Sequence, residues 1–317
     1  MSRKKLKNRR RKDRVQRKIL IAAVCIAAVI IGVGIGGHVI KKNAGKTMTT
    51  AETESKKAVS KKKATAKKLT INENETDASN KENQGQKDQA ADRSEFAVQP
   101  ERKVGTTEQS DEKVVYLTLD DGPSKNTQAV LDILDKYNAK ATFFVTGAMP
   151  EYKDMIKKAY DKGHTIGMHT YSHDYAKVYA SVDAYFQDLD QIGQLVKEEI
   201  GYVPCFIRFP GGSSNTISAS YTKGIMTTLT QEIQARGYQY YDWNGSSGDG
   251  AVRTTEQLVD QATSFHDNNI ILLSHDSETK DTTVEALPKI IEYYQSQGYV
   301  FKALDLNSYV AHHGVNN

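Results

Sequence analysis

The sequence predicts an α/β fold for residues 111–317, a closed (β/α) barrel of seven or eight strands. In this region, short runs rich in β-branched and aromatic residues alternate with longer stretches whose apolar residues recur at helical spacing. Such alternation is typical of parallel strands covered by helices, and seven or eight units suffice for a barrel. The alternative is a doubly wound open sheet, but no G-x-G-x-x-G motif follows the first strand to support it.

Local signals bound the expected elements. Glycines follow the second and third expected helices at Gly163 and Gly201, where a left-handed cap is favoured. The expected strands cover residues 114–119, 141–147, 164–170, 205–212, 238–243, 269–275 and 299–304. The expected helices cover residues 126–137, 151–163, 181–201, 218–237, 254–267 and 281–298.

The N-terminal 40 residues predict a membrane anchor. Residues 1–18 contain 11 Lys and Arg. Residues 19–40 contain no charged residue, and a helix of this length can cross a bilayer. Basic flanks stay in the cytoplasm, so we expect a single-pass protein of the cell membrane with its N-terminus inside and the rest outside. A cleaved signal peptide is the alternative, but the apolar run is long for one and no convincing A-x-A site follows. Because topology explains the basic segment, no nucleic-acid partner is expected.

Residues 41–110 predict a disordered extracellular linker, because their apolar residues are scattered singly among Lys, Ser, Thr, Glu, Gln and Asn. Charge separates this tail from the rest of the chain. Residues 1–110 carry a net charge of +14, whereas residues 111–317 carry −10. The two cysteines, Cys25 and Cys205, form neither a disulfide framework nor a metal-thiolate motif.

Polar residues with catalytic potential fall at the expected strand ends. Taken alone, each has an ordinary explanation as a turn, a packed histidine or a structural ion pair. In a barrel, however, the carboxyl ends of the strands meet on one face, where active sites are built. These residues are Asp120 and Asp121, His169 and His173, Arg208, Asp242, and His275.

Two imidazoles and one carboxylate can hold a divalent metal while leaving positions open for water and substrate. Zn²⁺ suits such a site best, and Co²⁺, Ni²⁺ or Fe²⁺ would also fit. The other carboxylate of the Asp120-Asp121 pair can act as general base on the activated water. His275 can protonate a departing amine. The residue set therefore predicts hydrolysis of an amide or an ester.

These residues also carry a family resemblance. The segments TLDDGP (118–123), HTYSH (169–173), RFPGG (208–212), DW (242–243) and LSH (273–275) resemble, in order, the five motifs of the polysaccharide deacetylases. These are the NodB-homology domains of carbohydrate esterase family 4, and the likeness covers residues 113–306. It implies a distorted (β/α) barrel and metal-dependent removal of acetyl groups from N-acetylated sugars. The anchor makes the whole chain similar to membrane-anchored peptidoglycan N-acetylglucosamine deacetylases.

The resemblance implies a role for each motif residue. The metal ligands would be Asp121, His169 and His173. The catalytic groups would be Asp120 as base, Arg208 orienting that base, His275 as acid, and Asp242 tuning the charge of His275.

The resemblance also implies substrate contacts at Gly211, Trp243 and Leu273. Trp243 and Leu273 would line the acetyl pocket, and the backbone N–H of Gly211 would face the oxyanion. The family often has an aromatic residue at this last position, so a sugar contact could differ here. In the polar loop 244–250, Ser246, Ser247 and Asp249 are either sugar contacts or parts of a flexible loop.

The sequence therefore favours a membrane-anchored, monomeric N-deacetylase whose catalytic domain spans residues 111–317. Its expected substrate is an N-acetylglucosamine polysaccharide of the cell surface, above all peptidoglycan. Exopolysaccharide, chitin-type oligomers and acetylxylan stay open as substrates. The alternative from a different class is a non-catalytic glycan-binding module.

Overall fold

A computed structural model of the chain describes residues 92–317. The expected cytoplasmic segment 1–18, the membrane span 19–40 and linker residues 41–91 lie outside this range. Within residues 92–317, none of the helices is both long and apolar enough to cross a membrane.

Eight parallel strands form one curved sheet in the order β5-β4-β3-β2-β1-β7-β6, with β8 pairing with the start of β1. Their bounds are β1 (Val114–Asp120), β2 (Ala141–Thr146), β3 (Thr165–Thr170), β4 (Phe206–Ile207), β5 (Gln239–Tyr240), β6 (Gly245–Ser246), β7 (Asn269–His275) and β8 (Val300–Phe301). Successive strands from β1 to β5 are neighbours and β1 also joins β7, which is the winding of a barrel rather than of a doubly wound sheet.

The barrel is not closed. No ladder joins β5 to β6 within the part of the chain that the structure describes, so the ring is open between these two strands. The expected strands over 205–212 and 238–243 are each reduced to two paired residues. After β4, the chain turns through Gly211 and Gly212 at positive φ. Strand β6, in a segment expected to be a loop, pairs with β7.

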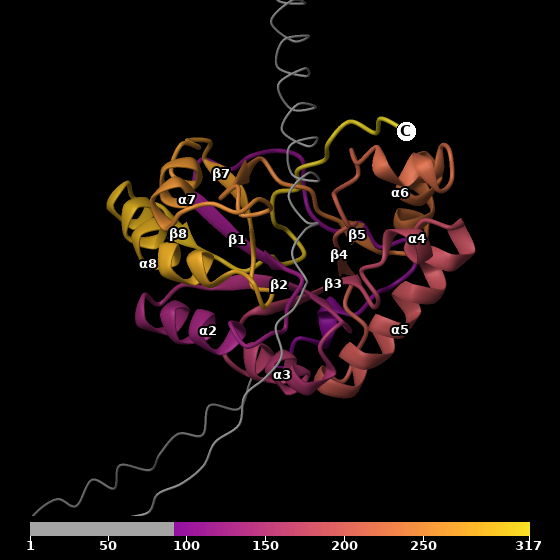
Figure 1. Cartoon of the computed structure of the whole chain (residues 1–317), viewed down its shortest axis with the longest axis horizontal. Helices are drawn as coiled ribbons and strands as arrows, with labels where there is room; N and C mark the ends of the chain where they lie inside the picture. The colour runs from indigo at the N-terminus through magenta and orange to yellow at the C-terminus, as the bar shows by residue number, and fades with distance from the viewer. Residues whose placement is uncertain (1–91) are drawn as a thin grey trace, which may run out of the picture. The chain divides into compact units, whose positions relative to one another are not determined.

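Helices cover the outer side of the curved sheet, from α8 and α2 through α3 and α5 to α6 (Figure 1). Their bounds are η1 (Ser94–Phe96), α2 (Thr127–Lys136), η2 (Pro150–Tyr152), α3 (Asp154–Asp161), α4 (Tyr175–Val178), α5 (Val182–Ile200), η3 (Ile217–Ser220), α6 (Ile225–Ala235), α7 (Thr255–Ala262) and α8 (Asp281–Ser296). Helix α5 begins at a Ser181 cap and ends at Gly201 with φ 92°, as expected. The single helix expected over 218–237 is instead η3 followed by α6.

Strand β1 is buried along its whole length, so its charged last residue, Asp120, lies in the interior rather than at the surface. Val115, Leu117 and Leu119 pack in the helix-covered core, whereas Val114 and Tyr116 belong to a second apolar cluster on the other face of the sheet. Because side chains alternate along a strand, Asp120 lies on the same face as Tyr116.

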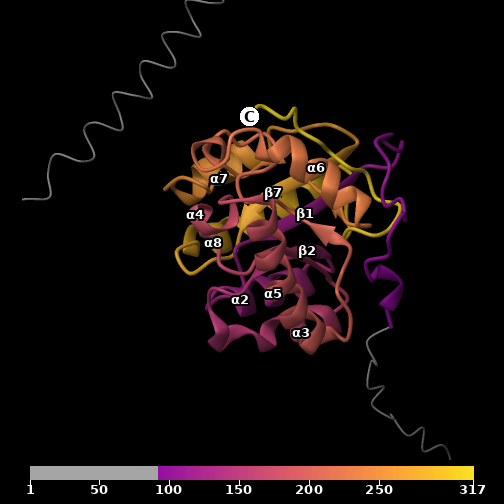
Figure 2. The ribbon, with the colours of Figure 1, turned by 90° about the vertical axis from the view of Figure 1, so that its right-hand side faces the viewer.

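Residues 92–110 correct the expected boundary of the linker, because several of them pack on the barrel. Arg93 donates a hydrogen bond from Nη1 to the backbone oxygen of His164 at 2.8 Å, and its guanidinium lies 4.1 Å from the ring centre of Tyr160. The ring of Phe96 packs edge-on against Phe206, at 5.2 Å between centres. This segment is seen in indigo at one side of the domain in Figure 2. The apolar residues of segment 92–110 pack at separate places on the barrel, so they show no periodicity in the sequence.

Candidate active site

The two adjacent carboxylates at the end of β1 point to different partners. Asp120 ends the strand and is 3% exposed. Asp121 has φ 70°, so the chain leaves the extended conformation there and turns its side chain away from that of its neighbour. Asp120 meets Arg208, and Asp121 faces His169 and His173. The two adjacent carboxylates therefore have separate partners, an arginine for Asp120 and two histidines for Asp121.

Asp121, His169 and His173 form a cluster suited to a divalent metal. Oδ1 of Asp121 lies 3.5 Å from Nε2 of His169 and 3.2 Å from Nε2 of His173, and one ligand atom from each residue lies within 4.8 Å of the others. Oδ1 of Asp121 is buried and has no hydrogen-bond partner among residues 92–317. A cation would satisfy this oxygen, so the donor set fits the metal that the sequence predicts.

The imidazole of His169 is neutral, which is the form that can bind a metal ion. Burial, reinforced by the neighbouring His173, lowers its pKa to about 3. Its Nδ1 lies 2.7 Å from the backbone oxygen of Arg208 and can donate only as N–H. The lone pair is therefore on Nε2, which faces Asp121.

The loop between the two histidines is fixed by Asp188 of α5, which sequence analysis missed. Its carboxylate accepts hydrogen bonds from the backbone N–H of Tyr171 at 2.5 Å and of Ser172 at 3.2 Å, and from the Ser172 hydroxyl at 2.5 Å. Asp188 is 7% exposed. Its place on the apolar face of the helix, three residues after Tyr185 and four before Ile192, is the signal that could have revealed it.

Arg208 forms a buried ion pair with Asp120. The guanidinium is fully buried and donates from Nη1 to Oδ1 of Asp120 at 2.8 Å and to the Thr118 hydroxyl at 2.7 Å. It also donates to the backbone oxygens of Tyr241 at 2.8 Å and Asp242 at 3.1 Å. Burial raises the pKa of Asp120, and the positive charge of Arg208 opposes that rise.

The partner of His275 is Asp249, which corrects the expectation of Asp242. Nδ1 of His275 lies 2.8 Å from Oδ1 of Asp249, whose other oxygen accepts the His275 backbone N–H at 2.8 Å and the Thr283 hydroxyl at 2.8 Å. Burial lowers the pKa of His275, but the hydrogen bond and charge of Asp249 outweigh it and raise that pKa to about 9. His275 is thus a charged imidazolium at neutral pH.

Asp242 instead ties together two loops beside the site. Its carboxylate accepts the backbone N–H of Ser213 at 2.8 Å, the Ser213 hydroxyl at 2.5 Å and the backbone N–H of His313 at 2.8 Å. These partners, Ser213 and His313, lie outside β7. The carboxylate of Asp242 therefore joins two loops and makes no hydrogen bond with His275.

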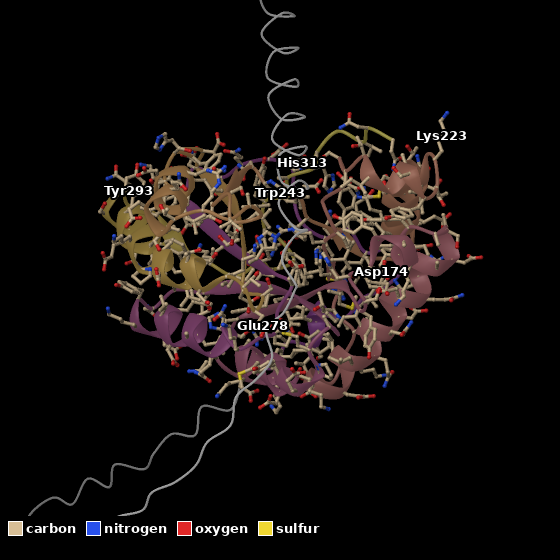
Figure 3. All side chains as sticks on the ribbon, in the orientation of Figure 1. Asp174, Lys223, Trp243, Glu278, Tyr293 and His313 are labelled. Carbon is tan, nitrogen blue, oxygen red and sulfur yellow. The ribbon has the colours of Figure 1, made fainter. Side chains whose placement is uncertain are left out.

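The residues expected to contact substrate lie around this cleft. Gly211 has φ 75°, and Leu273 is 7% exposed on β7 opposite Thr118. Trp243 lies with its ring centre 5.7 Å from the Arg208 guanidinium, and it packs edge-on against His313 (Figure 3).

The polar loop 244–250 is neither a flexible loop nor a plain sugar contact. Ser247 is buried and donates to the backbone oxygen of Leu273, and Asp249 is engaged by His275. Ser246 belongs to strand β6.

The fold and the cleft together define a barrel-type hydrolase. The family model for polysaccharide deacetylase matches residues 107–228. With the relatives described next, this match shows that the chain belongs to the polysaccharide deacetylase family.

Three relatives illustrate the range. The catalytic domain of a peptidoglycan N-acetylglucosamine deacetylase from Eubacterium rectale is 46% identical, covers 67% of this chain and 97% of its own, and superposes with a TM-score of 0.64. A peptidoglycan-N-acetylglucosamine deacetylase from Bacillus cereus is 32% identical over 60% of this chain and 69% of its own length. A bifunctional xylanase/deacetylase from Pseudobutyrivibrio xylanivorans is 34% identical over 62% of this chain and 30% of its own.

Proposed function

We propose that this protein removes N-acetyl groups from N-acetylglucosamine-containing polysaccharide of the cell surface, with peptidoglycan as its substrate. The observation that carries the proposal is the buried, unpartnered Oδ1 of Asp121 facing Nε2 of both His169 and His173. Asp120 and His275 lie close enough for each to influence the ionisation of the other. One cleft thus offers a metal-binding cluster, a base and an acid.

The residues divide the hydrolysis between them. Asp120, oriented by Arg208 through Oδ1, accepts a proton from the attacking water, whose oxygen forms the new bond to the acetyl carbon. The backbone N–H of Gly211 stabilises the negative charge that develops on the acetyl oxygen. His275, kept protonated by Asp249, gives its proton to the sugar nitrogen as the carbon–nitrogen bond breaks. The products are acetate and a glucosamine unit.

Asp121, His169 and His173 would hold the metal ion in this scheme. Zn²⁺ is the ion we propose, with Co²⁺, Ni²⁺ or Fe²⁺ as workable substitutes. A divalent ion bound there supplies charge that polarises the acetyl carbonyl and lowers the pKa of water.

The choice of peptidoglycan rests on relatives and on the N-terminal sequence. Relatives from Eubacterium rectale and Bacillus cereus carry this activity in their names. The uncharged segment 19–40 and the polar residues after it support an enzyme held outside the cell within reach of the wall.

Acetate release from defined glycans tests the proposal. Full-length protein, stripped of metal and reloaded with Zn²⁺ or Co²⁺, should release acetate from peptidoglycan and from N-acetylglucosamine oligomers. Asp120→Asn should bind metal as the wild type does but release no acetate, whereas the exposed control Asp111→Asn should match the wild type. A fully metal-loaded wild type that releases no acetate from any glycan would refute the function.

Two alternatives are separated by the same experiment. The xylanase/deacetylase relative favours acetylxylan as a second candidate substrate, and faster release from acetylxylan than from peptidoglycan would select it. A non-catalytic glycan-binding module would bind oligomers without a stoichiometric metal ion and without producing acetate.

A further inference from the structure

Tyr175 occupies a place in the cleft that none of the roles above uses. It is the first residue of α4, whose N-terminus is held by Asp174 through a 3.0 Å hydrogen bond from the Ala176 backbone N–H. Its ring packs edge-on against His173, at 6.0 Å between centres, and against Tyr179, at 5.4 Å. The short helix therefore fixes a phenol beside a metal-binding histidine. The neighbouring Asp174 is labelled in the right half of the molecule in Figure 3.

The hydroxyl of Tyr175 points at Gly211. A Cβ atom added to Gly211 would lie 2.6 Å from this hydroxyl oxygen, which is closer than real side chains approach. The loop carrying Gly211 is held in turn by Tyr179, whose hydroxyl donates to the backbone oxygen of Pro210 at 2.8 Å. Residue 211 is a glycine because its φ is 75° and because Tyr175 fills the space beside it.

This hydroxyl is free to act on a ligand. Tyr175 is only partly buried, so a ligand can reach its side chain. A tyrosine hydroxyl is protonated at neutral pH and can donate one hydrogen bond.

We propose that Tyr175 is a further substrate-contacting residue, whose hydroxyl donates a hydrogen bond to the acetyl oxygen next to the Gly211 backbone N–H. The inference rests on the proposed deacetylation. Two donors then converge on the oxygen where negative charge develops, and removing one such donor lowers turnover about 10²- to 10³-fold in other acyl-transfer enzymes. For a neutral phenol that shares the oxygen with a second donor, we expect a loss in kcat/KM of about 10- to 100-fold.

Tyr175→Phe in the full-length, Zn²⁺-loaded protein separates contact from packing, because the ring and its neighbours His173 and Tyr179 are retained. Tyr293→Phe is the matched control, since Tyr293 lies on α8 at the outer surface (Figure 3). We expect Tyr175→Phe to lower acetate release and to weaken binding of acetate, measured by calorimetry, about three- to tenfold. A purely structural role would leave both measurements at the value of the control.

A double-mutant cycle tests the geometry without any turnover. Gly211→Ala carries the strain of positive φ, a 3.1 Å contact with Cβ of Asn215 and the clash with the Tyr175 hydroxyl, whereas in a Tyr175→Ala background only that clash is removed. Gly211→Ala should therefore lower the Tm more in the wild-type background than in Tyr175→Ala. Equal losses in the two backgrounds would contradict the proposed contact.

The readouts keep the two proposals apart. If the wild type releases no acetate from any glycan, the deacetylase function fails, and acetate affinity and the Tm cycle still judge Tyr175. If the wild type is active and Tyr175→Phe equals Tyr293→Phe in turnover and in acetate affinity, the role of Tyr175 is overturned while the function stands.

Discussion

Asp249 holds Nδ1 of His275 at 2.8 Å, from a glycine-rich loop 26 residues earlier in the chain. The same carboxylate also accepts the His275 backbone N–H, so it fixes both the position of β7's last residue and the charge of its imidazole. Any proton donation by His275 thus depends on Asp249.

Asp249→Asn should shift the alkaline limb of the pH–rate profile to lower pH. In the proposed reaction, His275 gives up a proton and must therefore be protonated, and Asp249 raises its pKa to about 9. Without the charge of Asp249, burial lowers the pKa of His275. As the pH is raised, His275 should then lose its proton, and the enzyme its activity, at a lower pH than in the wild type. Profiles of kcat/KM for wild type, Asp249→Asn and Asp242→Asn measure this. An alkaline limb that moves in Asp242→Asn and stays in Asp249→Asn would restore the assignment made from sequence.

The same pair predicts how stability depends on pH. The pKa of His275 in the folded chain lies above its ordinary value of 6.5, so the folded state binds the proton more tightly. Its stabilisation is fully present below about pH 6.5 and is lost as the pH rises through about 9. Urea titrations at several pH values should show a steeper loss of stability over this range for wild type than for Asp249→Asn.

Asp242 and Asp249 show where the sequence argument reached its limit. Both follow β5 in the chain, Asp242 two residues and Asp249 nine residues after its end, and a strand-end rule favours the nearer one. Whether Asp242 or Asp249 contacts His275 depends on β6, a two-residue strand that pairs with β7. This pairing brings the loop that contains Asp249 next to His275. So short a strand leaves no periodic pattern in a run of Gly, Ser and Asn. By contrast, Asp121, His169 and His173 come together because long, fully buried strands fix where the chain turns.

Asp188→Asn should weaken metal binding about 10- to 100-fold, the usual effect of losing a group that orients metal ligands. Asp188 accepts three hydrogen bonds from Tyr171 and Ser172, and an amide can accept with only one of its two ends. Competition with a chelator measures the affinity directly. Asp190→Asn, an exposed neighbour on α5, is the matched control and should bind metal as the wild type does. If both variants kept wild-type affinity, the loop would not depend on Asp188.

Arg208→Leu should cost about 3–5 kcal/mol of unfolding free energy, because it leaves the carboxylate of Asp120 buried without its partner. The double variant Arg208→Leu/Asp120→Asn removes that charge as well and should recover part of the loss. Denaturant unfolding of wild type, both single variants and the double variant yields the coupling. Additive losses would mean that the buried pair contributes no interaction of its own.

The start of the folded domain is the other point that the sequence placed incorrectly. Composition marks residues 41–110 as one polar segment, yet Arg93, Phe96 and Val104 pack on the barrel. They dock where strands β3 and β4 begin, at the end opposite the cleft, as shown by the bonds of Arg93 to His164 and of Phe96 to Cys205. Isolated contacts of this kind depend on gaps in the tertiary structure, which local composition does not encode.

A chain beginning at residue 111 should therefore be less stable than one beginning at residue 92. Loss of Phe96 and Val104 exposes apolar surface worth about 3 kcal/mol or more. For a domain of this size, that corresponds to a Tm lower by about 6–12 °C. Phe96→Ala in the longer chain should reproduce part of the decrease, while the exposed control Glu95→Ala should not. Equal Tm values for the two truncated chains would mean that residues 92–110 do not stabilise the domain and belong to the linker.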